Sequence, residues 1–274
     1  MLADGIRPHP PLSHPPLERT SALTRRLLAP NPGPMTLDGT NSYLLAAPGA
    51  VASVVVDPGP LDEPHLARLA AAGPVALVLI THHHADHTAG SARFAALTGA
   101  PVRALDRLYC VGGDPLHGAE LIEAAGVSIR VLATPGHTSD SVCFHLAGDG
   151  AIKTEKRFGS VLTGDTVLGR GTTVVGHPDS TLREYLTSLE TLRALGPATV
   201  LPAHGPVLPD LAAICAAYLA HRHDRLGQVR RALIELGPTA TLAQVTDLVY
   251  AETHAAVRIA AEATVRAQLA YLRS

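Results

Sequence analysis

Short apolar runs alternate with glycine- and proline-rich stretches along most of this chain. Apolar runs that contain β-branched residues predict strands. They lie at residues 35–45, 51–59, 74–80, 101–106, 127–138, 141–148, 157–167 and 198–206. Stretches with capping signals and helical spacing of apolar positions predict helices at 61–73, 87–99 and 179–196. The mixture predicts an α+β fold in which helices cover layered sheets.

The pattern changes after residue 209, where strand-like runs give way to helical ones. Residues 211–237 predict one long helix, and residues 241–274 predict two or three more. This tail resembles the helical core of a winged-helix module, with the wing hairpin absent. The first 30 residues are rich in proline and predict an irregular arm. We therefore expect an N-terminal arm over 1–30, a main domain over 31–208 and a helical module over 209–274.

Composition narrows the classes of protein to consider. The 274 residues are 46% hydrophobic and 17% charged, which is enough for a packed core and too few charges for a disordered chain. The net charge of -2 gives no basic field for nucleic acid. Three scattered cysteines without a CxxC pair indicate a reducing compartment. No apolar run has the length of a membrane span and no signal peptide is evident, so we expect a cytoplasmic protein without a membrane partner.

The stretch THHHADHTAG, residues 81–90, follows a predicted strand and precedes a predicted helix. Residues two apart in an extended segment point the same way, so His82 and His84 are expected to face one site. His83 is expected to point elsewhere and to be structural or exposed. Asp86 and His87 come at the start of the helix, where they are placed to hold a second ion.

Three more metal-type side chains each follow an apolar strand and lie beside a glycine. They are His137 in TPGHTSDS, Asp165 in LTGDTVLG and His204 in LPAHGPV. Zinc binds imidazole nitrogen and carboxylate oxygen and takes three or four protein ligands. Two ions need more ligands than the first cluster holds, and these three segments offer the rest.

The motif HxHxDH, followed by PGHT, GD and AHG, resembles the pattern of the metallo-β-lactamase superfamily. The resemblance is greater to the glyoxalase II and ribonuclease Z-like branches, in which an aspartate bridges two metals. The segments NPGPMTLDGTNSYLL, VVVDPGP, LPAHGPV and YLAHRHDR, together with the helical tail, are similar to the β-lactamase-like protein 2 family. The resemblance covers nearly the whole chain from about Asn31 onward. It implies an αββα sandwich with the site at one edge of the two sheets.

The resemblance also implies two metal ions with defined ligands. Three histidines would hold the first metal, namely His82, His84 and His137. Zinc fits these ligands best, although iron and manganese fit the same set.

The second metal would be held by Asp86, His87 and His204, and Asp165 would bridge the two ions. Two cations that share a water lower its pKa toward neutrality and yield a hydroxide nucleophile. Asp86 would orient that hydroxide, so Asp86 and Asp165 are the predicted catalytic residues. The expected protein is a binuclear metallo-hydrolase.

Three functions remain open for this chain. The resemblance implies an endoribonuclease that cleaves phosphodiesters of single-stranded RNA, although the net charge and the 3% aromatic content speak against it. The alternative is a small-molecule thioester or ester hydrolase of the glyoxalase II type. A regulator that binds DNA is disfavoured by the complete metal set and the absent wing, so no sequence-specific DNA partner is expected. Predicted substrate-binding residues are Asn41 in the GTN turn and the tail residues His221 and Arg222.

Overall fold

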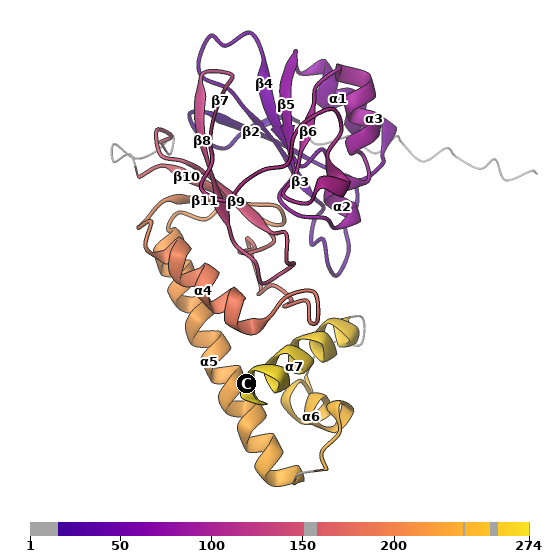
Figure 1. Ribbon diagram of the computed structural model, residues 1–274, viewed down its shortest axis with the longest axis vertical. Helices are drawn as coiled ribbons and strands as arrows, with labels where there is room; N and C mark the ends of the chain where they lie inside the picture. The colour runs from indigo at the N-terminus through magenta and orange to yellow at the C-terminus, as the bar shows by residue number, and fades with distance from the viewer. Residues whose placement is uncertain (1–15, 151–157, 238, 253–256, 274) are drawn as a thin grey trace, which may run out of the picture.

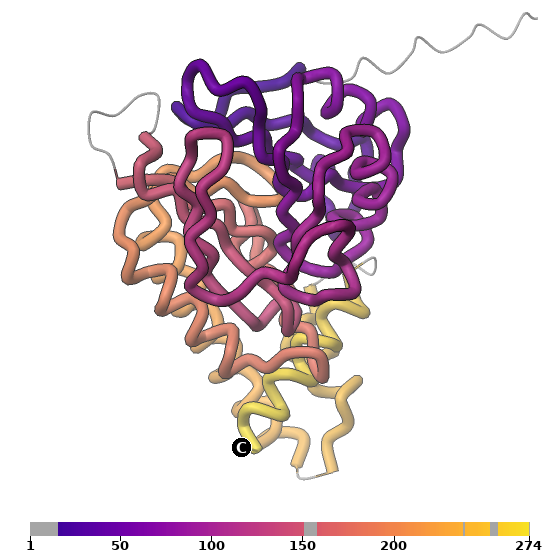
Figure 2. The backbone as a smooth tube through the Cα atoms, turned by 45° about the horizontal axis from the view of Figure 1, so that its top comes forward, coloured from indigo at the N-terminus to yellow at the C-terminus, as the bar shows by residue number. Residues whose placement is uncertain are grey.

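The computed structural model describes residues 16–150, 158–237, 239–252 and 257–273. Two mixed β-sheets lie face to face, helices flank them, and a helical tail extends beyond one end (Figure 1). Figure 2 shows the same arrangement as a tube, with the C-terminal tail at the end opposite the first strands. The α+β prediction is therefore confirmed.

The first sheet has six strands in the order of the chain, β1-β2-β3-β4-β5-β6. They are β1 (Glu18–Arg19), β2 (Thr24–Leu28), β3 (Asn41–Leu45), β4 (Ser53–Val56), β5 (Val75–Leu79) and β6 (Val102–Arg103). Strands β4, β5 and β6 are parallel and are connected by α1 (Glu63–Ala71) and α3 (Ser91–Thr98). The carboxyl ends of these three strands therefore lie at the same edge of the sheet, and the loop that follows β5 begins there.

The second sheet has five strands in the order β11-β10-β9-β8-β7. They are β7 (Leu121–Ala124), β8 (Val127–Ala133), β9 (Val142–Leu146), β10 (Ser160–Gly164) and β11 (Thr199–Pro202). β9 pairs antiparallel with both β8 and β10, and β10 pairs parallel with β11. Strands β8, β10 and β11 therefore run in one direction, and the segments that follow them emerge at the same edge.

Three apolar layers hold the sheets and helices together. Val54 and Val56 of β4 point between the sheets, whereas Val55 points to the outer face, because side chains alternate along a strand. On that outer face, Phe94 of α3 packs with the β4 valine. On the other sheet, Tyr185 of α4 (Leu182–Arg193) belongs to the layer under the helices. The order helix, sheet, sheet, helix is the expected αββα sandwich.

The tail consists of α5 (Leu211–Leu236), α6 (Leu242–Val249) and α7 (Arg258–Arg273). The first part of α5 packs along α4, and its second part forms a separate small core with α6 and α7. Within residues 211–237, 239–252 and 257–273 the structure describes helices and turns. The described helices include none with the length and apolar character needed to cross a membrane.

Several local predictions differ from the structure. The arm expected over 1–30 is wrong for its second half, because β2 pairs with β3 along its whole length; residues 1–15 lie outside the described part. The strand expected from residue 35 begins only at Asn41, after a series of turns. The helix expected over 87–99 is two helices, α2 (Ala85–Thr88) and α3. The helix expected over 179–196 is the shorter α4, which is capped by Thr181 and begins at Leu182.

Candidate metal centre

The predicted ligands come together in two groups at the shared edge of the sheets. Ligand atoms within each group lie within 4.8 Å of one another. The first group is His82, His84, His137 and Asp165, and the second group is Asp86, His87 and His204. All seven residues follow the carboxyl ends of β5, β8, β10 and β11. Loops after aligned strand ends bring distant sequence segments into one site.

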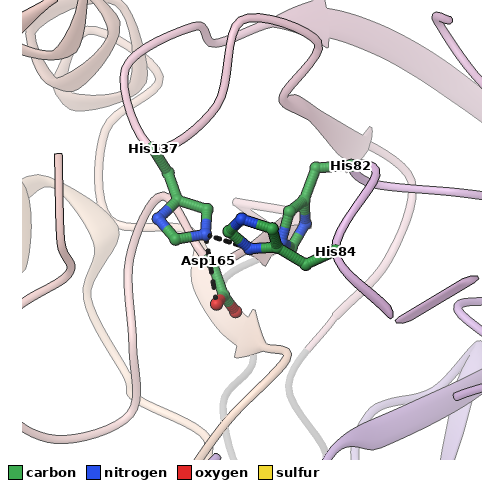
Figure 3. A group of neighbouring side chains, drawn as sticks. All are labelled: His82, His84, His137 and Asp165. Carbon is green, nitrogen blue, oxygen red and sulfur yellow. Dashed lines mark hydrogen bonds and ion pairs between the residues drawn. The ribbon is translucent and has the colours of Figure 1, made fainter. Parts of the chain in front are cut away.

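Imidazole nitrogens of the first group converge on one point (Figure 3). Nδ1 of His84 lies 3.1 Å from Nε2 of His82 and 3.0 Å from Nε2 of His137. Four ligands placed tetrahedrally at about 2.0–2.1 Å from a zinc ion stand about 3.3 Å apart. The three nitrogens therefore have the spacing of ligands to a common ion.

Asp165 lies between the two groups. Its Oδ2 is 3.5 Å from Nε2 of His137, in the first group. Its Oδ1 is 3.3 Å from Nε2 of His204 and 3.7 Å from Nε2 of His87, in the second group. Asp86 completes the second group, with Oδ2 at 3.2 Å from both of these histidine nitrogens. One carboxylate thus presents an oxygen to each group, which is the geometry of a bridging ligand.

Backbone carbonyls fix the orientation of two of the histidines. Nδ1 of His137 lies 2.9 Å from the carbonyl oxygen of Val174, and Nδ1 of His204 lies 3.1 Å from that of Gly39. A carbonyl only accepts, so each Nδ1 carries the proton and donates it. When the ring is neutral, as it is in a metal ligand, Nε2 carries the lone pair and faces the centre.

A buried aspartate outside the predicted ligand set, Asp57, orients two more histidines. Oδ2 of Asp57 accepts from Nδ1 of His87 at 2.9 Å and from the Thr81 hydroxyl at 2.7 Å. Because the Thr81 hydroxyl donates its only hydrogen to Asp57, it can only accept from Nδ1 of His82, which lies 3.1 Å away. Asp57 follows β4 directly, as the ligands follow their own strands, and this position was the signal available in the sequence.

The prediction for His83 agrees with the structure. Its Nδ1 lies 2.7 Å from Oδ1 of Asp140, and its ring stacks with that of Tyr109 at a centroid distance of 5.9 Å. His83 points away from His82 and His84, which belong to the first group.

The two groups have different electrostatic character. Burial lowers the pKa of each histidine in the first group, and that of His84 falls to about 4, so these rings are neutral and ready to bind a cation. Burial also acts on His204, but the carboxylates of Asp165 and Asp86 raise its pKa to about 9. Burial likewise opposes ionisation of Asp86, yet His87 and His204 hold its pKa well below the usual range. The second group therefore attracts positive charge strongly.

Unpartnered buried atoms test whether metal ions fit. Nε2 of His87, Nε2 of His204 and Oδ1 of Asp165 are buried, and although they lie within ion-pair distance of groups in the cluster, none makes a well-oriented hydrogen bond with a described residue. Buried polar atoms normally have partners, and these three point at the same small volume. A divalent cation would satisfy all of them, and imidazole with carboxylate suits zinc, iron or manganese. The residues present fit a pair of metal ions.

A glycine allows the two sheets to meet at this centre. Gly164, just before Asp165, has φ +50°, and a Cβ placed there would lie 2.8 Å from Cβ of Thr81. A larger residue would both strain the backbone and push the two strand ends apart. The glycine in LTGDTVLG thus lets the bridging carboxylate reach the β5 loop.

Asn41 lies behind the centre rather than in a substrate site. Its amide nitrogen donates to the carbonyls of Pro202 at 2.9 Å and Gly205 at 3.0 Å, and the residue is 1% exposed. These bonds hold the turn that carries His204. A side chain enclosed in this way cannot reach a substrate, so the predicted substrate role of Asn41 is not retained.

The two tail residues predicted to bind substrate line a cavity of about 340 Å³ that reaches the first metal group. His221 is half-buried, and burial together with the neighbouring Arg222 lowers its pKa. Arg222 is 2% exposed and donates from Nη2 to the carbonyl of Thr173. The structure thus places both residues at the cavity wall, with the guanidinium already bonded to the chain.

The sequence profile of the metallo-beta-lactamase superfamily matches residues 35–204. This match agrees with the sandwich fold and the two ligand groups. The chain therefore belongs to the metallo-β-lactamase superfamily and is a hydrolase of that class. The chain is similar to a beta-lactamase-like protein 2 homolog from Caenorhabditis elegans, with 31% identity over 270 residues, 92% of this chain and 85% of that protein. The predicted family resemblance is therefore confirmed.

The chain is also similar to a second protein by sequence and to a solved structure by fold. The chain is 36% identical over 236 residues to an atrochrysone carboxyl ACP thioesterase from Aspergillus chevalieri, a match that covers 82% of this chain and 70% of that protein. The crystal structure of a metallo-beta-lactamase family protein from Thermus thermophilus superposes with a TM-score of 0.74 and 25% identity. That superposition covers 91% of this chain and 93% of the other, so the shared architecture includes the tail.

Proposed function

We propose that the protein hydrolyses a thioester or ester of a small, largely apolar acyl group at the two-metal centre. The observation that carries this proposal is the cavity of about 340 Å³ beside the centre, which has His137 and Asp165 in its wall. Much of the remaining wall is apolar, from Pro34, Met35, Leu37, Leu168, Val174, Val257, Ala260 and Ala261. Concave, mostly apolar sites with a few polar groups suit small organic substrates.

The arginines of the cavity wall are already engaged with the chain. Arg170 pairs with Asp38, with Nη2 and Oδ1 2.8 Å apart. Arg225 donates to the carbonyl of Val249 at 2.9 Å and lies 4.6 Å above the ring of Tyr250. Arg222 is bonded to the loop as described above. A phosphodiester chain requires a groove of available cations and stacking aromatic rings, so this wall favours a small acyl substrate over RNA.

The printed name of one relative also supports thioester chemistry. The Aspergillus chevalieri protein is named a thioesterase and is 36% identical over most of this chain. Cleavage of single-stranded RNA, which the sequence resemblance favoured, remains the second candidate because the similarity to the beta-lactamase-like protein 2 homolog covers 92% of the chain.

The chemistry divides between the ions and the chain. When bound, two metal ions would lower the pKa of water toward neutrality and polarise the substrate carbonyl. Fixed Nδ1 partners turn the Nε2 atoms of four histidines toward the centre. The side chain of Asp86 is more exposed than that of Asp165, 27% against 10%, so Asp86 is the group placed to accept a hydrogen bond from the attacking water and orient it.

The test is a substrate panel with purified protein that carries two equivalents of zinc. The panel contains N-acetylcysteamine thioesters with acetyl to decanoyl chains, matched oxygen esters and a labelled single-stranded RNA. We expect thioester hydrolysis whose rate rises with acyl length until the cavity is filled, and hydrolysis at least about 100-fold slower by Asp165→Ala. RNA cleavage without thioester or ester hydrolysis would overturn the proposal in favour of the second candidate.

A further inference from the structure

A long irregular segment carries part of the first metal group. Residues 165–181 connect β10 to α4 without helix or strand, and they begin with the bridging Asp165. The same segment supplies the Val174 carbonyl that fixes the proton on Nδ1 of His137. An irregular segment has no ladder of hydrogen bonds to hold it, so its position depends on contacts with neighbouring elements.

The segment wraps closely around His137. The Thr173 hydroxyl lies 3.2 Å from Nδ1 of His137, and the Gly176 N–H donates to the His137 carbonyl at 3.2 Å. A shift of this segment would therefore move the partner of the imidazole, and with it the direction of the Nε2 lone pair.

Helix α5 of the tail anchors the segment at three backbone positions. The Tyr218 hydroxyl accepts from the N–H of Leu168 at 3.2 Å and donates to the carbonyl of Gly171 at 2.8 Å. Arg222 donates to the carbonyl of Thr173. Tyr218 and Arg222 are four residues apart and so lie on one face of the helix.

Arg222 is an unusual residue to hold this segment against α5, because its charged guanidinium is buried. It is 2% exposed, forms no ion pair with any residue in the described ranges, and leaves its Nε without a hydrogen-bond partner. Its guanidinium carbon lies 5.1 Å from the centre of the Tyr185 ring, whose hydroxyl donates to the carbonyl of Thr166 at 2.9 Å. Burying an unpaired guanidinium costs free energy that a helix-packing contact alone would not require.

We propose that Arg222, with Tyr218, is a positioning residue for the first metal ion. The pair holds residues 168–173 so that the next residue, Val174, orients His137 toward the ion. The helical tail thus helps to orient a ligand of the first metal ion and also forms part of the cavity wall. This inference concerns metal binding and does not depend on the identity of the substrate.

The test compares Arg222→Met, Arg222→Lys and Tyr218→Phe with Arg230→Met, which makes the same change at an exposed arginine of the same helix. Each purified protein is loaded with Co²⁺, its visible absorption is recorded, and a chelator competes for the ions. We expect Arg222→Met to weaken the binding of one of the two ions by up to about 10-fold and to change the Co²⁺ absorption of that site. The loss lies at the lower end of that seen when direct partners of metal ligands are removed, because Arg222 acts on His137 through residues 173 and 174. Arg222→Lys should restore part of the loss, and Tyr218→Phe should show a smaller loss in the same ion.

Arg230→Met should behave like the parent protein in both measurements. If Arg222→Met lowers the melting temperature but leaves both affinities and the Co²⁺ absorption unchanged, Arg222 only stabilises the fold and the proposal is wrong. If Arg222→Met does not fold, the same comparison rests on Arg222→Lys and Tyr218→Phe. Unchanged metal binding in both of those folded variants would also overturn the proposal.

Discussion

Oδ2 of Asp57 and Nδ1 of His87 lie 2.9 Å apart, and the two side chains are 2% and 0% exposed. The pair lies directly behind the second metal group, so the carboxylate sets which ring nitrogen of His87 carries the proton. The same carboxylate orients His82 of the first group through Thr81. One residue that would touch neither ion thereby aligns a ligand of each.

Asp57→Asn should weaken both metal sites. Both carboxylate oxygens of Asp57 now accept hydrogen bonds from Thr81 or His87. In the variant one of these oxygens becomes an amide N–H₂ group, which cannot accept, so at least one of the bonds is lost. Removing such a partner typically costs about 10–100-fold in metal affinity. Chelator competition measures this loss. Asp62→Asn, which changes an aspartate that caps α1, is the matched control and should leave metal affinity unchanged.

Asp165→Ala should bind fewer metal ions than the parent protein. Its two oxygens face different ligand groups, and without them each ion has one ligand fewer. We expect about one ion per chain by elemental analysis after gel filtration, and a loss of hydrolysis of at least about 100-fold. A variant that retains two ions per chain would show that Asp165 does not bridge.

Removal of the metal ions should lower the thermal stability of the protein. A ligand that binds only the folded state adds about 2.7 kcal/mol per site at a free concentration 100-fold above its dissociation constant. At about 2–4 °C per kcal/mol, dialysis against a chelator should lower the melting temperature by at least about 5 °C. Calorimetry during stepwise return of zinc should restore the transition by two equivalents. Full restoration at one equivalent would contradict a two-metal site.

Ala260→Leu should shorten the acyl chains that the enzyme accepts. Ala260 is half-buried and lies in the cavity wall, so the larger side chain reduces the apolar space beside the centre. Each methylene of a substrate in an apolar pocket is worth about 10-fold or more in kcat/KM. We expect at least that loss for decanoyl thioesters and little change for acetyl thioesters. Ala263→Leu, on the same helix but outside this cavity wall, serves as control, and equal losses for both chain lengths would count against the assigned acyl site.

Strand ends were the most informative feature of the sequence. The seven predicted ligands share the pattern of an apolar strand followed by a turn, and the structure brings all of them together in two groups. Side-chain type and strand direction are local properties, which explains why the ligand set could be predicted without the tertiary structure.

Features that depend on tertiary contacts were not predictable. β2 has adjacent arginines, Arg25 and Arg26, in place of alternating apolar residues, and it joins the sheet because β3 offers it a partner. Asp57 directly follows a strand, as the ligands do, but only the packing of the β4 and β5 ends shows that it contacts Thr81 and His87. Arg222 lies in a polar stretch of the tail, and only the packing of α5 against residues 165–181 shows that it is buried.

The ligands of each metal group come from both sheets: His82, Asp86 and their neighbours follow β5 of the first sheet, whereas His137, Asp165 and His204 follow strands of the second. Bound ions would therefore fasten the two layers together at the edge where they meet, much as a cross-link does. The supply of metal would then affect the stability of the folded chain as well as any metal-dependent activity. A chain made when metal is scarce would open more readily at this edge and be degraded faster, so that the amount of enzyme in a cell would follow the metal available to it.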